Sequence, residues 1–154
     1  MIDFVELAAE LANDEGEKLY VYDDATGLPI RPGTLVKGHP SIGRGRCLDT
    51  HGISKAESLY LNNDDMQDVA SQLTASLPWF EALDSVRQTA LANLTFNLGI
   101  GGLLRFHNTL AYLAAGRYDA AADELLATKP WIDEVGARGK RIAEMIRTGE
   151  WVAR

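Results

Sequence analysis

Residues 15–46 read EGEKLYVYDDATGLPIRPGTLVKGHPSIGRGR, and this stretch decides the fold. A short β-prone run, Leu19 to Tyr22, is followed by repeated breaks at glycine and proline. Glycine and proline residues at these positions predict turns between short strands and exclude a long helix. The end of the stretch, residues 41–46, predicts a strand interrupted by glycines, where missing side chains allow close backbone approach. We therefore predict a small β lobe over residues 17–50.

Helical patterns flank this lobe on both sides. Apolar residues at helical spacing behind Asp3 predict a short first helix over 3–12, with Asp3 as its N-cap. Ser54 and Glu57 have the spacing of a capping box, which predicts a long helix running to about Ala75. Further helices are predicted over 84–98, 108–115, 118–127 and 137–147.

The predicted architecture is α+β, with a small β-hairpin lobe, a larger helical lobe and a cleft between them. We expect a single domain over residues 1–154, because the chain is one domain's length and contains no repeat or linker. The helical lobe would comprise residues 54–154 and the N-terminal helix. Apolar residues at 46% and charged residues at 24% exclude disordered and low-complexity classes.

The single cysteine and the first residues of the chain indicate in which compartment the protein is made. Cys47 cannot form an internal disulfide, and we predict it to be a small buried apolar residue. The first eleven residues include three acids and lack a long apolar run, so we expect no signal peptide, no membrane insertion and synthesis in the cytoplasm.

The net charge of -7 argues against nucleic-acid binding. The charge is unevenly spread, however. Residues 31–47, which we call the basic segment, carry Arg31, Lys37, Arg44 and Arg46 and no acid. This segment is either ordinary solvated surface or a local attractor for an anionic partner.

Two carboxylates stand on either side of the first predicted strand. Glu15 lies just past the first predicted helix and Asp24 in the following turn, with eight residues between them. Two carboxyl groups facing each other across a cleft are what glycoside hydrolysis needs. An acid at a helix end and an aspartate in a turn are also common structural features, so spacing alone leaves both interpretations open. The three histidines lack a spacing that puts two ligands on one helix face, so we expect no metal site.

Several motifs together resemble one family across nearly the whole chain. They are Glu15, Asp24, the strand Ser41-Ile42-Gly43-Arg44-Gly45-Arg46, residues 90–99 (ALANLTFNLG), 106–110 (FHNTL), 138–141 (RGKR) and 146–151 (IRTGEW). This combination resembles the bacteriophage-type lysozymes, which are endolysin muramidases.

The resemblance implies a role for each matching residue. Glu15 would protonate the glycosidic oxygen, Asp24 would stabilise positive charge at the sugar carbon or orient the attacking water, and the Ser41 hydroxyl would help hold that water. Arg138 would pair with the acid, which opposes the effect of burial on its pKa. Phe96 and Thr109 match positions that line the sugar cleft, although Phe96 is equally consistent with a core aromatic.

Three positions depart from the family pattern. Ser41 replaces the commoner threonine and keeps its hydroxyl, so we expect activity to survive. Sixteen residues separate Asp24 from Ser41, a longer hairpin than shorter family members have. Arg46 stands where many relatives have histidine, so no histidine-dependent stabilisation carries over.

The resemblance implies a phage endolysin that hydrolyses the β-1,4 bond between N-acetylmuramic acid and N-acetylglucosamine in peptidoglycan, by inversion and without a cofactor. It would act as a monomer on glycan strands, leaving the host cytoplasm for the periplasm or cell wall through a separate pore-forming protein. Two alternatives stay open. One is a lytic transglycosylase, although that chemistry needs no water-holding pair. The other is a non-catalytic wall-binding protein with a lysozyme fold.

Overall fold

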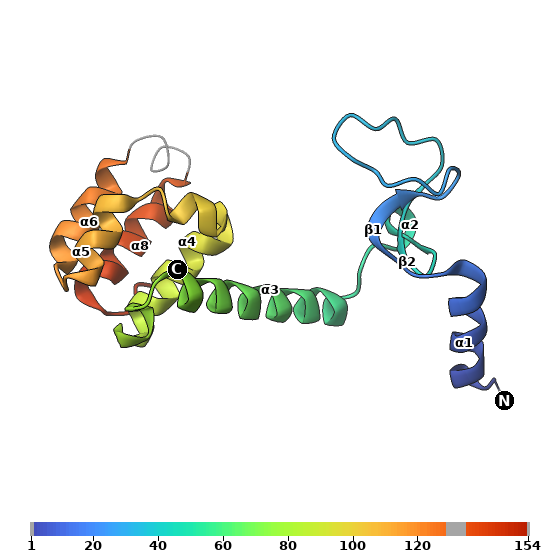
Figure 1. Cartoon of the computed structure of the whole chain (residues 1–154), viewed down its shortest axis with the longest axis horizontal. Coiled ribbons are helices and arrows are strands. Elements are labelled where there is room, and N and C mark those ends of the chain that lie inside the picture. The colour runs from blue at the N-terminus through green and yellow to red at the C-terminus, as the bar shows by residue number, and fades with distance from the viewer. Residues whose placement is uncertain (1, 129–134, 154) are drawn as a thin grey trace. The chain divides into compact units, whose positions relative to one another are not determined.

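The computed structural model describes residues 2–128 and 135–153, with only the backbone of residues 14 and 15. The chain forms two compact units, Met1–Leu59 and Tyr60–Arg154. The first unit contains α1 (Phe4–Glu15), β1 (Lys18–Asp23), β2 (Pro40–Gly43), β3 (Arg46–Cys47), α2 (Leu48–His51) and the start of α3 (Lys55–Ser76) (Figure 1). Helices with one small sheet confirm the predicted α+β class.

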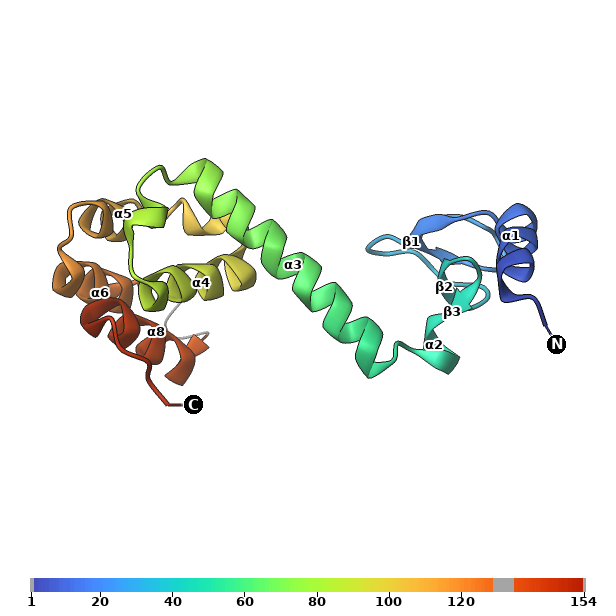
Figure 2. The same cartoon turned by 90° about the horizontal axis from the view of Figure 1, so that it is seen from below.

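The second unit is helical in its described part. After the end of α3 come the 3-10 helix η1 (Phe80–Ala82), α4 (Ser85–Leu103), α5 (His107–Ala114), α6 (Tyr118–Ala127) and α8 (Ala137–Thr148) (Figure 2). None of the helices described for this chain combines the length and hydropathy that a bilayer crossing requires. The assignment of the whole chain to a single domain stays a prediction.

Helix α1 begins as predicted and ends later. The Asp3 carboxylate accepts hydrogen bonds from the N–H groups of Val5 and Glu6 at 3.0 and 3.1 Å, which confirms the N-cap. The helix was expected to stop near residue 12 but continues to Glu15, where Gly16 turns the chain at a φ of 67°. Glu15 is therefore the last residue of α1 and does not lie beyond it.

The sheet is antiparallel in the order β1-β2-β3, so β2 is its central strand. The connection between β1 and β2 is the long open loop seen at the top of the first unit in Figure 1. The capping box at the start of α3 is confirmed: the Ser54 N–H donates to Glu57 at 2.7 Å, and the Glu57 N–H donates to the Ser54 hydroxyl at 3.2 Å. These bonds fix where the helix begins.

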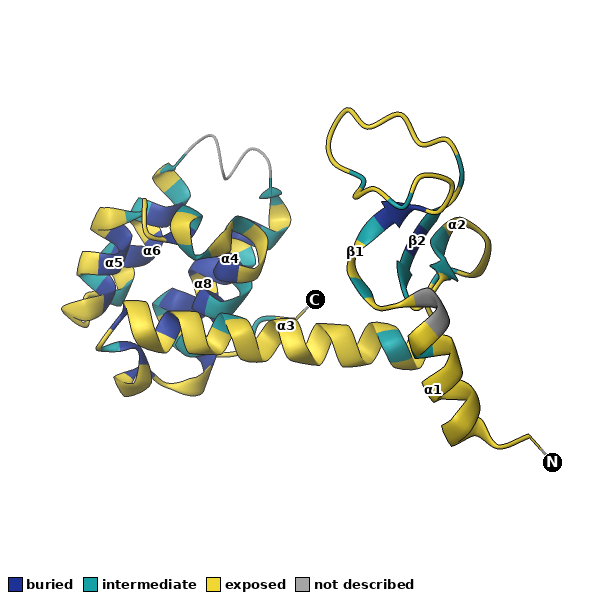
Figure 3. Cartoon of the chain, turned by 45° about the vertical axis from the view of Figure 1, so that its right-hand side comes forward, coloured by how far each residue is buried: buried dark blue, intermediate teal, exposed yellow. Residues whose placement is uncertain are grey.

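The core of the second unit lies where α4, α5, α6 and α8 face one another (Figure 3). Its innermost side chains have 2% exposure or less: Leu73, Leu91, Leu94, Leu103, Leu113, Leu125, Ile142 and Ile146. Each such burial stabilises the fold by about 1.5–3 kcal/mol. Helix α4 was expected to stop near Gly99. The backbone does leave helical geometry there, but it resumes and ends at Leu103.

Candidate active site

The central strand β2 places Ser41 between two neighbours. Ser41 is directly opposite Tyr22 of β1 and Cys47 of β3. Residues directly opposite in an antiparallel pair point to the same face, so these three side chains lie together on one side of the sheet. Ser41 is 2% exposed.

Asp24 is fixed at the entrance to the long hairpin. Its carboxylate accepts a hydrogen bond from the His39 N–H at 2.7 Å, and its own N–H donates to the His39 carbonyl at 3.1 Å. Gly38 allows this approach, since a Cβ at that position would overlap the Asp24 carboxylate. The two ends of the loop are thereby held next to Ser41.

Asp23 is a structural residue that the sequence analysis missed. Its carboxylate accepts hydrogen bonds from the backbone N–H groups of Lys37, Gly38 and Ala25 at 2.8, 2.9 and 3.0 Å, and the residue is 2% exposed. The Lys37 N–H is the main cause that lowers the pKa of Asp23 below its usual 3.8, while burial opposes it. Asp23 therefore organises the hairpin as an anion.

Asp24 and Ser41 share one cavity of about 350 Å³ in the first unit. Its lining comes from α1, all three strands and the turns beside them: Leu11, Lys18, Tyr22, Asp24, Ser41, Arg44, Gly45 and Cys47. Two of these residues carry positive charge. The Lys18 ammonium lies 4.0 Å from the Tyr22 ring centroid, and the Arg44 guanidinium is 3.4 Å from the Glu17 carboxylate. The cavity thus combines a carboxylate, a hydroxyl and two cations.

The structure describes only the backbone of Glu15. It ends α1 directly before Gly16, and two residues separate it from the start of β1. Its side chain lies outside the described residues, so its role as the acid and its pairing with Arg138 stay predictions.

Arg138 and Phe96 meet in a cavity of about 550 Å³ in the second unit. The Arg138 guanidinium donates to the side-chain and backbone oxygens of Asn93 at 2.9 and 3.2 Å. Phe96 is 49% exposed and lines the cavity wall, which argues against the interpretation of Phe96 as a core aromatic.

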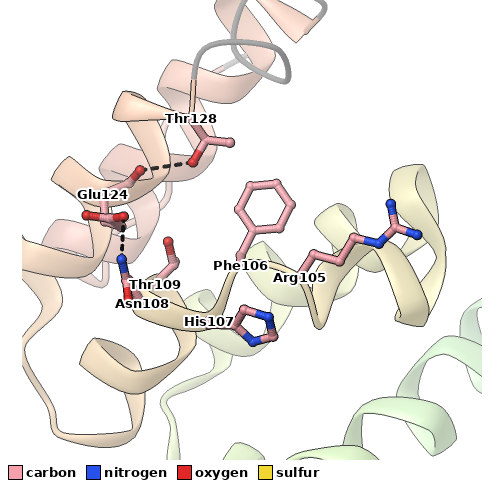
Figure 4. A pocket seen from close by; sticks show the side chains of 7 residues that line it. All are labelled: Arg105, Phe106, His107, Asn108, Thr109, Glu124 and Thr128. Atoms are coloured by element: carbon pink, nitrogen blue, oxygen red, sulfur yellow. Dashed lines mark hydrogen bonds between the residues drawn. The ribbon is translucent and has the colours of Figure 1, made fainter.

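Thr109 lines a different depression, of about 250 Å³, between the start of α5 and the end of α6 (Figure 4). It is 1% exposed, and its hydroxyl oxygen has no hydrogen-bond partner among the described residues. Beside it, Asn108 donates to the Glu124 carboxylate at 2.9 Å. Phe96 and Thr109 therefore do not share one pocket.

Two of the four cationic side chains of the basic segment form ion pairs with described residues of the protein. Arg44 pairs with Glu17, and Arg46 donates to the Gly52 carbonyl at 2.7 Å and to the Glu57 carboxylate at 2.9 Å. Arg46 thus ties β3 to the start of α3. Arg31 and Lys37 are exposed in the long hairpin, where they face solvent.

Cys47 corrects a prediction. It was expected to be a buried apolar residue, but it is half-buried, and its thiol donates to the Asp49 carboxylate at 2.8 Å. His39 Nδ1 lies 2.8 Å from the other oxygen of the same carboxylate. The thiol is the main cause that lowers the pKa of Asp49, and the Asp49 hydrogen bond raises the pKa of His39. These are the side chains of the described residues that could hold a metal ion together.

Comparison with known proteins gives matches along most of the chain. The phage lysozyme family pattern matches residues 12–147. The pre-baseplate central spike protein Gp5 of Enterobacteria phage T4 is 29% identical; the alignment covers 93% of this chain but only 28% of that protein. Probable T4-type lysozymes 1 and 2 of Dictyostelium discoideum are 27% and 26% identical, with 90% of this chain and 92% of each relative covered.

Proposed function

The chain belongs to the phage lysozyme family, and on this basis we propose that it is a glycoside hydrolase that cleaves the β-1,4 bond between N-acetylmuramic acid and N-acetylglucosamine in peptidoglycan. The observation that carries the proposal is the cavity lined by both Asp24, which directly follows β1, and Ser41 of the neighbouring strand β2. A fold alone does not establish an activity, whereas a carboxylate and a hydroxyl in one cavity supply groups that hydrolysis uses.

In the proposed mechanism, Glu15 donates a proton to the glycosidic oxygen as the bond to the sugar carbon breaks. Asp24, as an anion, stabilises the positive charge that develops on the sugar ring or orients a water molecule. The Ser41 hydroxyl holds that water, which adds its oxygen to the sugar carbon and gives up a proton to Asp24 or to solvent, while Glu15 takes up a proton again from solvent. Phe96 would bind a sugar ring through its exposed face, Thr109 would line a separate depression beside α5, and Arg138 would pair with Glu15.

The cations beside the reacting groups have a supporting role. Lys18 and Arg44 line the same cavity as Asp24, and their positive charge attracts the anionic cell wall. We expect these residues to contribute to binding of the wall and not to proton transfer.

The test is lysis of purified peptidoglycan by the full chain and by matched variants. Glu15→Gln is expected to abolish lysis, because the amide cannot donate the proton. Glu10→Gln is the control, since Glu10 is an exposed carboxyl on the same helix. Equal lysis by the Glu15→Gln variant and the wild type would refute the proposed acid.

Ser41 offers a second matched pair. Ser41→Ala removes the hydroxyl and is expected to lower turnover, while Ser41→Thr keeps the hydroxyl and is expected to retain activity. If both variants lysed the wall as the wild type does, Ser41 would have no part in holding water.

The products separate the proposed hydrolase from the two alternatives. Hydrolysis adds water and gives reducing N-acetylmuramic acid ends, whereas a lytic transglycosylase gives anhydro-muropeptides, which mass spectrometry distinguishes. A wall-binding protein without activity would sediment with peptidoglycan and release no fragments. Anhydro products as the main species would overturn the proposed hydrolysis.

The biological setting has two candidates. The resemblance favours an endolysin for host lysis, with release through a separate pore-forming protein. The similarity to a protein named as a baseplate spike favours a second setting, in which the same activity belongs to a phage particle. Antibody detection in gradient-purified particles, compared with the free fraction of the lysate, distinguishes the two settings.

A further inference from the structure

Three potential metal ligands of different chemistry converge in the first unit. They are His39 Nδ1, Cys47 Sγ and a carboxylate oxygen of Asp49, and these atoms all lie within 4.8 Å of one another. His39 directly precedes β2, Cys47 ends β3, and Asp49 lies in α2. The His39 and Asp49 side chains are 56% and 45% exposed, so an ion from solvent can reach them.

We propose that His39, Cys47 and Asp49 form a binding site for a zinc-type divalent cation. An imidazole nitrogen, a thiolate and a carboxylate are ligands that Zn²⁺ accepts, and three protein ligands leave the fourth tetrahedral position to water. Calcium and magnesium prefer sites built from oxygen atoms alone, so the thiol and imidazole select against them.

The spacing of the three groups needs little change to accept the ion. In a tetrahedral zinc site the ligand atoms lie about 2.0–2.3 Å from the metal, and hence about 3.3–3.8 Å from one another. Asp49 is 2.8 Å from His39 Nδ1 through one carboxylate oxygen and 2.8 Å from Cys47 Sγ through the other. The three ligand atoms all lie within 4.8 Å of one another. Each separation must therefore change by about 1 Å or less, with the Asp49 carboxylate moving to meet the ion. Its exposed position on the short helix α2 permits this movement.

The other two ligands are held by the backbone around them. The His39 N–H and carbonyl are both bonded to Asp24, and Cys47 pairs with Ser41 in the sheet. Coordination replaces the thiol proton of Cys47, which leaves to solvent, while His39 donates the lone pair of Nδ1. A bound ion would then join the start of β2 to the end of β3. Its ligand His39 lies two positions before Ser41 in the chain.

This site departs from the expectation of no metal. That expectation rested on the spacing of histidines along helices, whereas these ligands come from the residue before β2, the end of β3 and the short helix α2. The proposed metal site can be tested independently of the proposed hydrolysis, because the test measures bound metal and not activity towards peptidoglycan.

The test uses the full chain, stripped of metal with a chelator and titrated with Co²⁺ and then Zn²⁺. Co²⁺ is expected to produce a thiolate-to-metal charge-transfer band and the visible bands of a tetrahedral site. Zn²⁺ is expected to displace it at a single equivalent and to raise the melting temperature. No cobalt spectrum and no Zn²⁺ binding by calorimetry would overturn the site.

Three variants assign the ligands. Cys47→Ser is expected to abolish the charge-transfer band, and His39→Gln to weaken Zn²⁺ binding by more than about tenfold while keeping the backbone bonds to Asp24. His51→Gln is the matched control, because His51 is an exposed histidine bonded to Thr50 and outside the cluster. If His51→Gln removed binding, or Cys47→Ser left the spectrum unchanged, the proposed ligands would be wrong.

Discussion

Gly38→Ala tests whether the position of Asp24 depends on the close packing of the hairpin. A Cβ at residue 38 would overlap Asp24 Oδ1 and come within 2.8 Å of the Ala25 backbone nitrogen. Removing the overlap requires the carboxylate oxygen to move by about 1 Å. A displacement of that size in a reacting group can cost about 100-fold in rate.

The same substitution also overpacks the turn. Overpacking typically costs about 1–3 kcal/mol, which for a chain of this size lowers the melting temperature by about 2–12 °C. We therefore expect kcat/KM on soluble peptidoglycan fragments to fall about 100-fold, measured well below the variant's melting temperature so that the folded protein is assayed.

Gly101→Ala is the control for the loss of a glycine. Gly101 lies in α4, and an added Cβ there would meet nothing within 4 Å. We expect unchanged lysis and an unchanged or slightly higher melting temperature, since alanine favours a helix. If Gly38→Ala matched the wild type in both rate and melting temperature, the packing argument and the placement of Asp24 would both be refuted.

Three further outcomes are expected. Arg31→Gln with Lys37→Gln should weaken lysis at low salt more than at high salt, because salt screens the attraction between exposed charges and the anionic wall; an unchanged salt profile would make the two charges ordinary surface. Leu73→Ala should lower the free energy of unfolding by about 2–5 kcal/mol, whereas Leu61→Ala, half-exposed on the same helix, should change it by less than about 0.5 kcal/mol. Because its pKa is lowered on folding, Asp23 contributes stability that is present above its unfolded pKa of 3.8 and lost as the pH falls through its lower folded pKa. Asp23→Asn should therefore reduce the melting temperature at pH 7 and flatten its acid dependence, and a wild-type melting curve at pH 7 would contradict this.

Local chemistry explains what could be predicted from the sequence. The caps formed by Asp3 and by Ser54 with Glu57 involve residues within three positions of each other, so their spacing was sufficient. The end of α1 was placed too early because the apolar pattern stops before Gly16, which is the residue that ends the helix.

Long-range contacts explain what could not be predicted. The role of Asp23 depends on N–H groups 14 and 15 residues away. The partial exposure of Cys47 depends on its pairing with Ser41 and its bond to Asp49. No periodicity or propensity contains this information, because each contact is made only after the hairpin has closed.

The two ends of the long β1–β2 hairpin are held together by hydrogen bonds, so the length of the loop does not change where Asp24 and Ser41 lie relative to each other. Asp23 and Asp24 bind the backbone of residues 37–39 through four hydrogen bonds, so the chain returns to the sheet next to the point where it left. The register Tyr22↔Ser41 is then fixed whatever the length of the loop between, since longer loops add little closure entropy. Ser41 consequently meets Asp24 in one cavity although sixteen residues separate them. The catalytic roles of Asp24 and Ser41 stay predictions, and the exposed loop between them carries the charges of Arg31 and Lys37.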